Sequence, residues 1–159
     1  MEIDRQRIQD DLRGIVRGDV LCDSVSTALY STDASIYEIQ PIGIVRPRSA
    51  ADVVALIQYA CEQDLPIHAR GSGSGVSGES IGPGLVIDFS RYMRRMQIHF
   101  GDGSATVQSG ITLAEVNRNL RPSGRWFGPD PATRSINRLS CEDAEAAIRV
   151  FAGESFLTD

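Results

Sequence analysis

The residues best suited to chemistry in this sequence are the glycines and serines that directly follow a strand-like segment near its middle. They run Arg70-Gly71-Ser72-Gly73-Ser74-Gly75-Val76-Ser77-Gly78. Glycine admits positive φ values and lets another molecule approach the main chain closely. Successive amides that point the same way form a concave site for anionic oxygens, to which serine hydroxyls add donors. The segment therefore predicts a loop that holds a pyrophosphate group, with a flexible surface loop as the alternative interpretation.

Residues 73–78 also match the GxGxxG pattern of the Rossmann dinucleotide fold. That fold requires a helix immediately after the glycines, because the helix N-terminus meets the phosphates. Only Glu79, Ser80 and Ile81 precede Gly82-Pro83-Gly84, and the next segment is strand-like. No helix fits in this space, so the sequence argues against a Rossmann site.

The segments around the loop alternate between helical and strand-like patterns, which predicts an α+β fold. Apolar spacing and capping residues predict, in chain order, a helix over 4–16, a strand over 42–45, a helix that begins after Ser49 and ends at Asp64, and strands over 66–69 and 85–89. The first β-α-β unit of this series is expected to form a parallel strand pair with a right-handed crossover.

The second half of the chain has the pattern of antiparallel strands and further helices. Two strand-like runs flank Gly101-Asp102-Gly103-Ser104, which predicts a hairpin. Thr112 and Glu115 have capping-box spacing at the start of an amphipathic segment, and residues 127–131 are expected to form a rigid loop. Ser140 and Asp143 repeat the capping pattern and predict a short helix that ends near Gly153.

Composition indicates one domain of an ordinary globular protein. The chain has 159 residues, a formal net charge of -5 and a pI near 5.0, which disfavours a nucleic-acid partner. No apolar run approaches the roughly 20 residues of a membrane span, and the charged N-terminus does not resemble a signal peptide. The three cysteines are scattered, so we expect reduced thiols, no metal site and a cytoplasmic location.

Several segments together resemble the FAD-binding domain of the vanillyl-alcohol oxidase / p-cresol methylhydroxylase (PCMH) type. Within that family the chain is most similar to FAD-linked glycolate and D-lactate dehydrogenases. The resemblance covers roughly residues 30–135. Its segments are Ile44-Val45-Arg46-Pro47, the run from Leu65 to Gly78, Leu85-Val86-Ile87-Asp88-Phe89-Ser90-Arg91-Tyr92-Met93, Val107-Gln108-Ser109-Gly110 and Gly128-Pro129-Asp130-Pro131-Ala132-Thr133.

The resemblance implies a PCMH-type N-terminal subdomain over residues 40–135, in which β-α-β is followed by antiparallel strands and a helix, with a helical extension over 1–39. It implies that the loop wraps the FAD pyrophosphate and that a second segment approaches the flavin. The implied cofactor residues are Arg70, Gly71, Ser72, Gly73, Ser74, Gly75, Ser77, Gly78, Pro129, Asp130 and Thr133. Relatives oxidise a 2-hydroxy acid by hydride transfer to FAD.

Two residues near the loop bear on how FAD would be held. Ser74 stands where covalently flavinylated relatives carry a histidine, so the resemblance implies non-covalent FAD. His68 precedes the loop and is expected to be a packed or surface histidine rather than a flavin attachment. Arg70 could face a phosphate or pair with Asp88.

The chain departs from the family after residue 135. No glycine occurs from Ser135 to Ala152, although the family has a second glycine-rich stretch there. Residues 136–159 are therefore expected to be a divergent helical tail, and the chain a truncated family member without catalytic residues of its own. Either FAD binds, alone or with a second chain that supplies the missing half, or the chain is a non-catalytic interaction module that has lost FAD. A complete small flavin reductase of the MurB type is disfavoured, because nothing downstream supplies a substrate domain.

Overall fold

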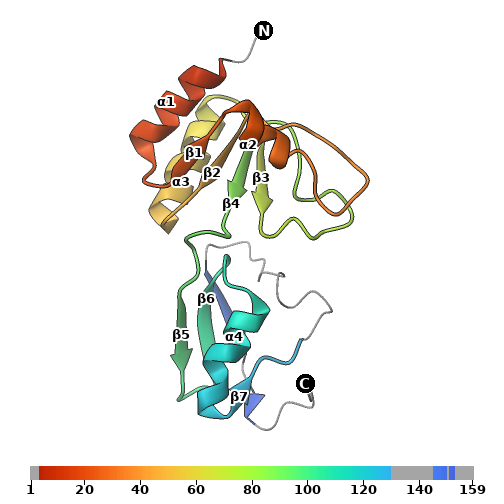
Figure 1. Cartoon of the computed structure of the whole chain (residues 1–159). Helices are drawn as coiled ribbons and strands as arrows, with labels where there is room; N and C mark the ends of the chain where they lie inside the picture. The colour runs from red at the N-terminus through yellow and green to blue at the C-terminus, as the bar shows by residue number, and fades with distance from the viewer. Residues whose placement is uncertain (1–3, 130–144, 150, 153–159) are drawn as a thin grey trace. The chain divides into compact units, whose positions relative to one another are not determined.

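The computed structural model of the chain describes residues 4–129, 145–149 and 151–152. It divides into two compact units, residues 1–92 and residues 93–159, and each is described here by itself (Figure 1). Among the described residues, no helix has both the length and the apolar character needed to cross a bilayer. The thiols of Cys22, which is buried, and Cys61, which is exposed, are both free, as expected; Cys141 lies outside the described residues.

The first unit is built on a four-stranded sheet with the order β1-β2-β4-β3. The strands are β1 (Asp19–Leu21), β2 (Gly43–Arg46), β3 (Ile67–Arg70) and β4 (Leu85–Asp88). β2 and β3 each pair in parallel with β4, while β1 pairs antiparallel with β2. The expectation that β2 and β3 form a pair is therefore wrong, although they are parallel. β4 lies between them because all four of its residues are apolar or paired and can be buried, as a central position requires.

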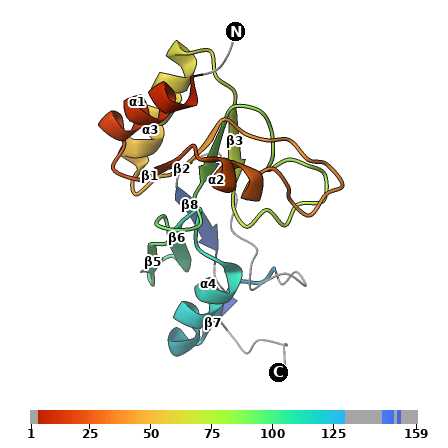
Figure 2. The same ribbon diagram turned by 45° about the horizontal axis from the view of Figure 1, so that its top comes forward.

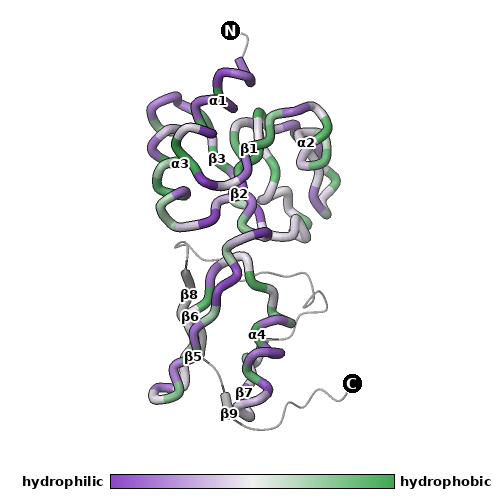
Figure 3. Tube along the Cα trace, turned by 60° about the vertical axis from the view of Figure 1, so that its left-hand side comes forward, coloured by the Kyte–Doolittle hydropathy of each residue, from purple (hydrophilic) through white to green (hydrophobic). Residues whose placement is uncertain are grey.

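Three helices pack on this sheet: α1 (Arg5–Ile15), α2 (Ser24–Leu29) and α3 (Ala50–Glu62). α1 and α3 lie together on one face (Figure 2), where their apolar side chains join those of the sheet in one core. α2 lies on the opposite side (Figure 3). The sequence predicted α1 and α3 but not α2 or β1, because segments of six and three residues are too short to show a period.

Helix α1 is mostly hydrophilic, as the purple tube in Figure 3 shows, and buries a narrow stripe formed by Ile8 and Leu12. The apolar residues Val53, Leu56, Ile57 and Ala60 predict one buried face for α3, and the structure departs from it in part. Ile57 is 43% exposed, and Tyr59 takes a place in the core instead. Tyr59 can do so because its hydroxyl donates to Oδ2 of Asp11 on α1 at 3.0 Å, which satisfies its polar end.

This contact predicts a loss of stability at high pH. Burial, followed by the hydrogen bond to Asp11, raises the pKa of Tyr59 to about 12 from its ordinary 10.0. Because the folded state holds the proton more tightly, the contribution is fully present below pH 10 and is lost as pH rises towards 12. The unfolding free energy, measured in urea from pH 8 to pH 12, should fall more steeply for the natural chain than for Tyr59→Phe. The half-exposed Tyr37, changed to Phe, is the control; parallel curves for Tyr59→Phe and the natural chain would contradict the prediction.

The second unit contains the predicted hairpin and capped helix. β5 (Met96–His99) and β6 (Ser104–Gln108) pair antiparallel across the Asp-Gly turn. The capping box of α4 (Leu113–Leu120) is complete, because the Thr112 side chain accepts from the Glu115 amide and the Glu115 carboxylate accepts from the Thr112 amide. A short 3-10 turn, Arg121–Ser123, leads to β7 (Arg125–Trp126). Ala105, Val107, Ile111, Val116 and Leu120 form the core.

The helix predicted over 140–153 is wrong for the residues that the structure describes. They form strands β8 (Glu145–Arg149) and β9 (Phe151–Ala152). β8 pairs antiparallel with β6, and β9 pairs with β7. Alanine and glutamate favour a helix locally, but the unpaired edge of β6 offers main-chain donors and acceptors that a strand satisfies. Tertiary pairing therefore overrides the local preference.

Candidate functional site

The glycine-rich residues form a loop that leaves the carboxyl end of β3 and returns to the start of β4. Residues 71–84 contain only bends, turns and irregular backbone, so the absence of a Rossmann helix is confirmed. Gly73 and Gly78 have φ values of +68° and +80°. Side chains other than glycine adopt this region at a cost of roughly 1–3 kcal/mol each. The path of the loop therefore depends on glycine at these two positions.

A second loop, residues 31–42, runs beside the glycine loop (Figure 1). The Ala34 amide donates to the Gly73 carbonyl at 3.0 Å, and Ser80 Oγ donates to Asp33 Oδ2 at 3.0 Å. A Cβ built on Gly78 would lie 2.9 Å from the ring of Tyr37, so the tyrosine packs directly against this glycine. These contacts hold the glycine loop along its length, which disfavours the interpretation as a free flexible loop.

Arg70 supports the loop from within. Its Nη2 donates to the Thr32 carbonyl at 2.9 Å, its Nη1 donates to the Ser80 carbonyl at 3.4 Å, and its guanidinium lies 5.1 Å from the centre of the Tyr30 ring. A Cβ on Gly73 would come within 2.5 Å of Arg70 Nη2, so glycine leaves room for this arginine. The alternative ion pair of Arg70 with Asp88 is absent from the described residues, although the two are register partners on β3 and β4.

Asp88 instead belongs to a polar network at the carboxyl ends of β2 and β4. Its Oδ2 lies 3.4 Å from Arg46 Nε and accepts from the Tyr30 hydroxyl at 2.5 Å. Arg46 also lies 3.7 Å from Asp19 on β1. Burial, together with the hydrogen bond to Asp88, raises the pKa of the Tyr30 hydroxyl.

Tyr30 connects this network to the glycine loop, because its ring faces both Arg46 and Arg70. Sequence analysis missed this role, since Tyr30 lies in a stretch without a clear period. The only available signal was that a tyrosine, an arginine and an aspartate occur near the ends of elements, which is too common to be specific.

The loop presents polar groups of its own. Ser72 Oγ and Ser74 Oγ lie 3.0 Å apart in a hydrogen bond, and the Ser77 amide donates to Glu79 Oε2 at 3.1 Å. The loop residues from Gly71 to Ser77 are exposed or half-buried, so a ligand can reach this part of the main chain from solvent. Positive φ at glycine, backbone amides and hydroxyls are the features that fit a pyrophosphate, and no metal ligand set of three or more groups occurs among the described residues.

His68 is a packing residue, as expected. Its Nε2 lies 2.7 Å from the Pro83 carbonyl, and a Cβ on Gly82 would overlap its ring. Of the second predicted segment, Pro129 is exposed and belongs to the second unit, whereas Asp130 and Thr133 lie outside the described residues. The structure therefore brings together Arg70 and the loop glycines and serines, and the place of the second segment stays a prediction.

Sequence comparison identifies a family. Residues 41–140 match the model of an "FAD binding domain". D-2-hydroxyglutarate dehydrogenase of Escherichia coli K12 is 33% identical over 120 residues, which are 73% of this chain and 12% of the relative. Glycolate oxidase subunit GlcD of Bacillus subtilis is 28% identical over 114 residues, 70% of this chain and 24% of the relative. The chain thus spans less than a third of the length of these curated relatives.

Solved structures agree on the fold. 6-Hydroxy-D-nicotine oxidase of Arthrobacter nicotinovorans superposes with a TM-score of 0.64 and 25% identity, covering 71% of this chain and 25% of that one. An alkyldihydroxyacetonephosphate synthase gives a TM-score of 0.73 with 22% identity, covering 84% of this chain and 30% of that one. The glycine loop, the mixed sheet and the match over residues 41–140 lead to one conclusion: this chain belongs to the FAD-binding domain family of FAD-linked oxidoreductases, in the PCMH-type fold.

Proposed function

We propose that this chain binds FAD non-covalently and that the loop over residues 71–78 holds the pyrophosphate. The observation that carries the proposal is a glycine loop fixed on both sides by hydrogen bonds, with positive φ at Gly73 and Gly78 and with serines at exposed or half-buried positions. Such a loop can surround an anion with main-chain amides without the help of a helix dipole. Because the chain belongs to an FAD-binding family, we take the bound pyrophosphate to be that of FAD.

The chain's residues would share the work of binding. Amides of residues 71–75 would donate to pyrophosphate oxygens, and Ser72, Ser74 and Ser77 would add hydroxyl donors. Arg70 would keep the loop in shape through Thr32 and Ser80 while its charge favours an anion nearby. Serine at position 74 supplies no nucleophile for a histidyl-flavin link, which supports non-covalent binding. We extend the proposal to Pro129, Asp130 and Thr133 as a second contact with the flavin.

We further propose that the chain serves an oxidoreductase of 2-hydroxy acids. The curated relatives are named for 2-hydroxyglutarate, glycolate and lactate, which share a hydroxyl group next to a carboxylate. Bound FAD would supply the acceptor for the hydride from the hydroxyl-bearing carbon. We assign no catalytic residue within the described part of the chain, and groups from a further segment or a second chain would bind the substrate and accept its hydroxyl proton.

The alternative is a non-catalytic interaction module that keeps the scaffold and has lost FAD. The sequence between Ser135 and Ala152 favours it, because no glycine there offers a second cradle. Half of a cofactor site binds weakly, since the ordering costs remain while the contacts decrease.

An absorption spectrum of the purified chain, recorded before and after incubation with FAD and gel filtration, tests the proposal. Flavin bands in near-stoichiometric amount are the expected result, and acid precipitation should release the flavin into the supernatant. A colourless chain that shows no heat of binding with FAD in calorimetry would overturn FAD binding and favour the interaction module. Flavin that stays with the precipitate would overturn only the non-covalent mode.

A further inference from the structure

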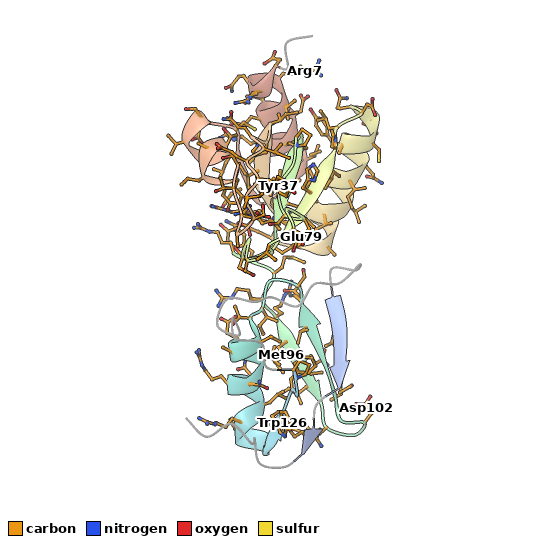
Figure 4. All side chains as sticks on the ribbon, turned by 90° about the vertical axis from the view of Figure 1, so that its right-hand side faces the viewer. Arg7, Tyr37, Glu79, Met96, Asp102 and Trp126 are labelled. Carbon is orange, nitrogen blue, oxygen red and sulfur yellow. The ribbon has the colours of Figure 1, made fainter. Side chains whose placement is uncertain are left out.

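The glycine loop already has a carboxylate against its amides. Glu79 Oε2 accepts a hydrogen bond from the Ser77 amide at 3.1 Å. The same carboxylate lies against Gly75, where a Cβ would overlap it. Figure 4 labels Glu79 in the first unit, on the same part of the molecule as Tyr37, which packs on Gly78 at the end of the loop. The loop therefore holds an anionic group of its own chain.

The contacts of Glu79 place it in competition with any anion that enters the loop. A backbone N–H is one donor, and at Ser77 that donor is engaged by the carboxylate. A phosphate oxygen at the same place would also face the negative charge of Glu79. None of the ion pairs among the described residues includes Glu79.

Glu79 can leave this position at little structural cost. The residue is exposed, and the loop has other fixed points at Gly73, Gly78 and Ser80, where Ala34, Tyr37 and Asp33 hold it. Rotation of an exposed glutamate about its side-chain bonds disturbs no core packing.

We infer that Glu79 is an internal competitor of the loop's anionic ligand: it occupies the Ser77 amide and the surface of Gly75 in the free chain and must swing out when a pyrophosphate group binds. This residue then sets the affinity of the loop. The naming of FAD as the ligand rests on the function proposed above, whereas the competition itself applies to any pyrophosphate.

Removal of the charge at position 79 should strengthen binding. FAD is titrated into the natural chain, Glu79→Gln and Glu79→Ala, with Glu62→Gln as the matched control, because Glu62 is an exposed glutamate at the end of α3. The expected result is a Kd lowered about tenfold in Glu79→Gln, and at least as much in Glu79→Ala, from the loss of like-charge repulsion at short range. The Kd of Glu62→Gln should stay within about twofold of the natural value, because distant surface charges are screened.

Inorganic pyrophosphate, followed by the amide NMR signals of residues 71–78, provides a second readout that does not depend on FAD. In free Glu79→Gln the NMR signal of the Ser77 amide should be shifted from its position in the natural chain. On titration, this signal should respond at a lower pyrophosphate concentration than in the natural chain. FAD binding that is unchanged or weaker in both Glu79 variants overturns the inference and leaves the proposed function standing. No FAD binding in any variant, with tighter pyrophosphate binding in Glu79→Gln, overturns the function and supports the inference. A loop that responds to neither ligand in any variant overturns both.

Discussion

Replacing Gly73 with valine should reduce the affinity for FAD by about ten- to a hundredfold, because the change strains the loop at the proposed pyrophosphate site. Gly73 has a φ of +68°, a conformation that a β-branched residue adopts only as an outlier. Its new Cβ would also lie 2.5 Å from Arg70 Nη2, so the arginine that supports the loop would have to move. The measurement is the Kd for FAD by calorimetry or by flavin fluorescence.

Two further variants separate loop strain from general damage. Gly101→Val is the matched control, because a Cβ added at Gly101 would meet nothing within 4 Å, and the change should leave FAD binding unchanged. Gly73→Asn should keep more affinity than Gly73→Val, since asparagine tolerates positive φ better than other side chains. Equal FAD affinity in Gly73→Val and the natural chain, with both folded by circular dichroism, would show that the loop does not bind the cofactor.

Replacing Asp88 with alanine should lower the unfolding free energy by about 3 kcal/mol, which is typical of removing one partner from a buried ion pair. The Asp88 side chain is 5% exposed, and its oxygens meet Arg46, the Tyr30 hydroxyl and the Ser90 amide. Without the carboxylate, Arg46 keeps a longer contact of 3.7 Å with Asp19 and its hydrogen bond to the Tyr30 hydroxyl, but loses its buried ionic partner. Urea unfolding followed by circular dichroism measures the loss.

The partner of Asp88 provides the decisive comparison for this network. Arg46→Met combined with Asp88→Ala should cost less than the sum of the two single changes, because the second change removes a charge that the first has left unpaired. Asp10→Ala, at an exposed position where the carboxylate accepts from Gln6 on the same helix, should change stability by less than about 1 kcal/mol. Additive effects of Arg46→Met and Asp88→Ala would contradict the description of the two as a coupled pair.

The two effects are expected to differ in kind. Asp88 lies beneath the loop and reaches it through the Tyr30 ring and Arg70, so its loss should lower FAD affinity only as far as the fold is weakened. Gly73 lies in the loop itself, and its substitution should lower affinity by more than it lowers stability. For each variant, the loss of FAD affinity is compared with the loss of unfolding free energy. A large loss of affinity for a small loss of stability identifies a residue of the binding loop rather than one that supports the sheet.

The sequence predicted the elements that have long periods or complete capping pairs. Helices α1 and α3 span three or more turns, which is long enough for an apolar stripe to be detected in the sequence. The capping box of Thr112 and Glu115 predicts the start of α4. The Asp-Gly turn likewise identified the β5–β6 hairpin. The loop from Arg70 to Gly78 was recognised from its glycines, because glycine is selected by backbone conformation, a local property.

Only the tertiary structure decided which segments lie side by side. The order β1-β2-β4-β3 places β4 between β2 and β3, which are consecutive in the chain. Residues 145–149 form strand β8 because they pair with the free edge of β6. The contacts that shape the site, from Tyr30 to Asp88 and from Asp33 to Ser80, join residues 58 and 47 positions apart. Backbone conformation and helical periodicity are set by near neighbours and can be read along the chain. Strand pairing and buried polar contacts depend on the free energy of the whole packed unit. That free energy cannot be inferred from any short stretch of the sequence.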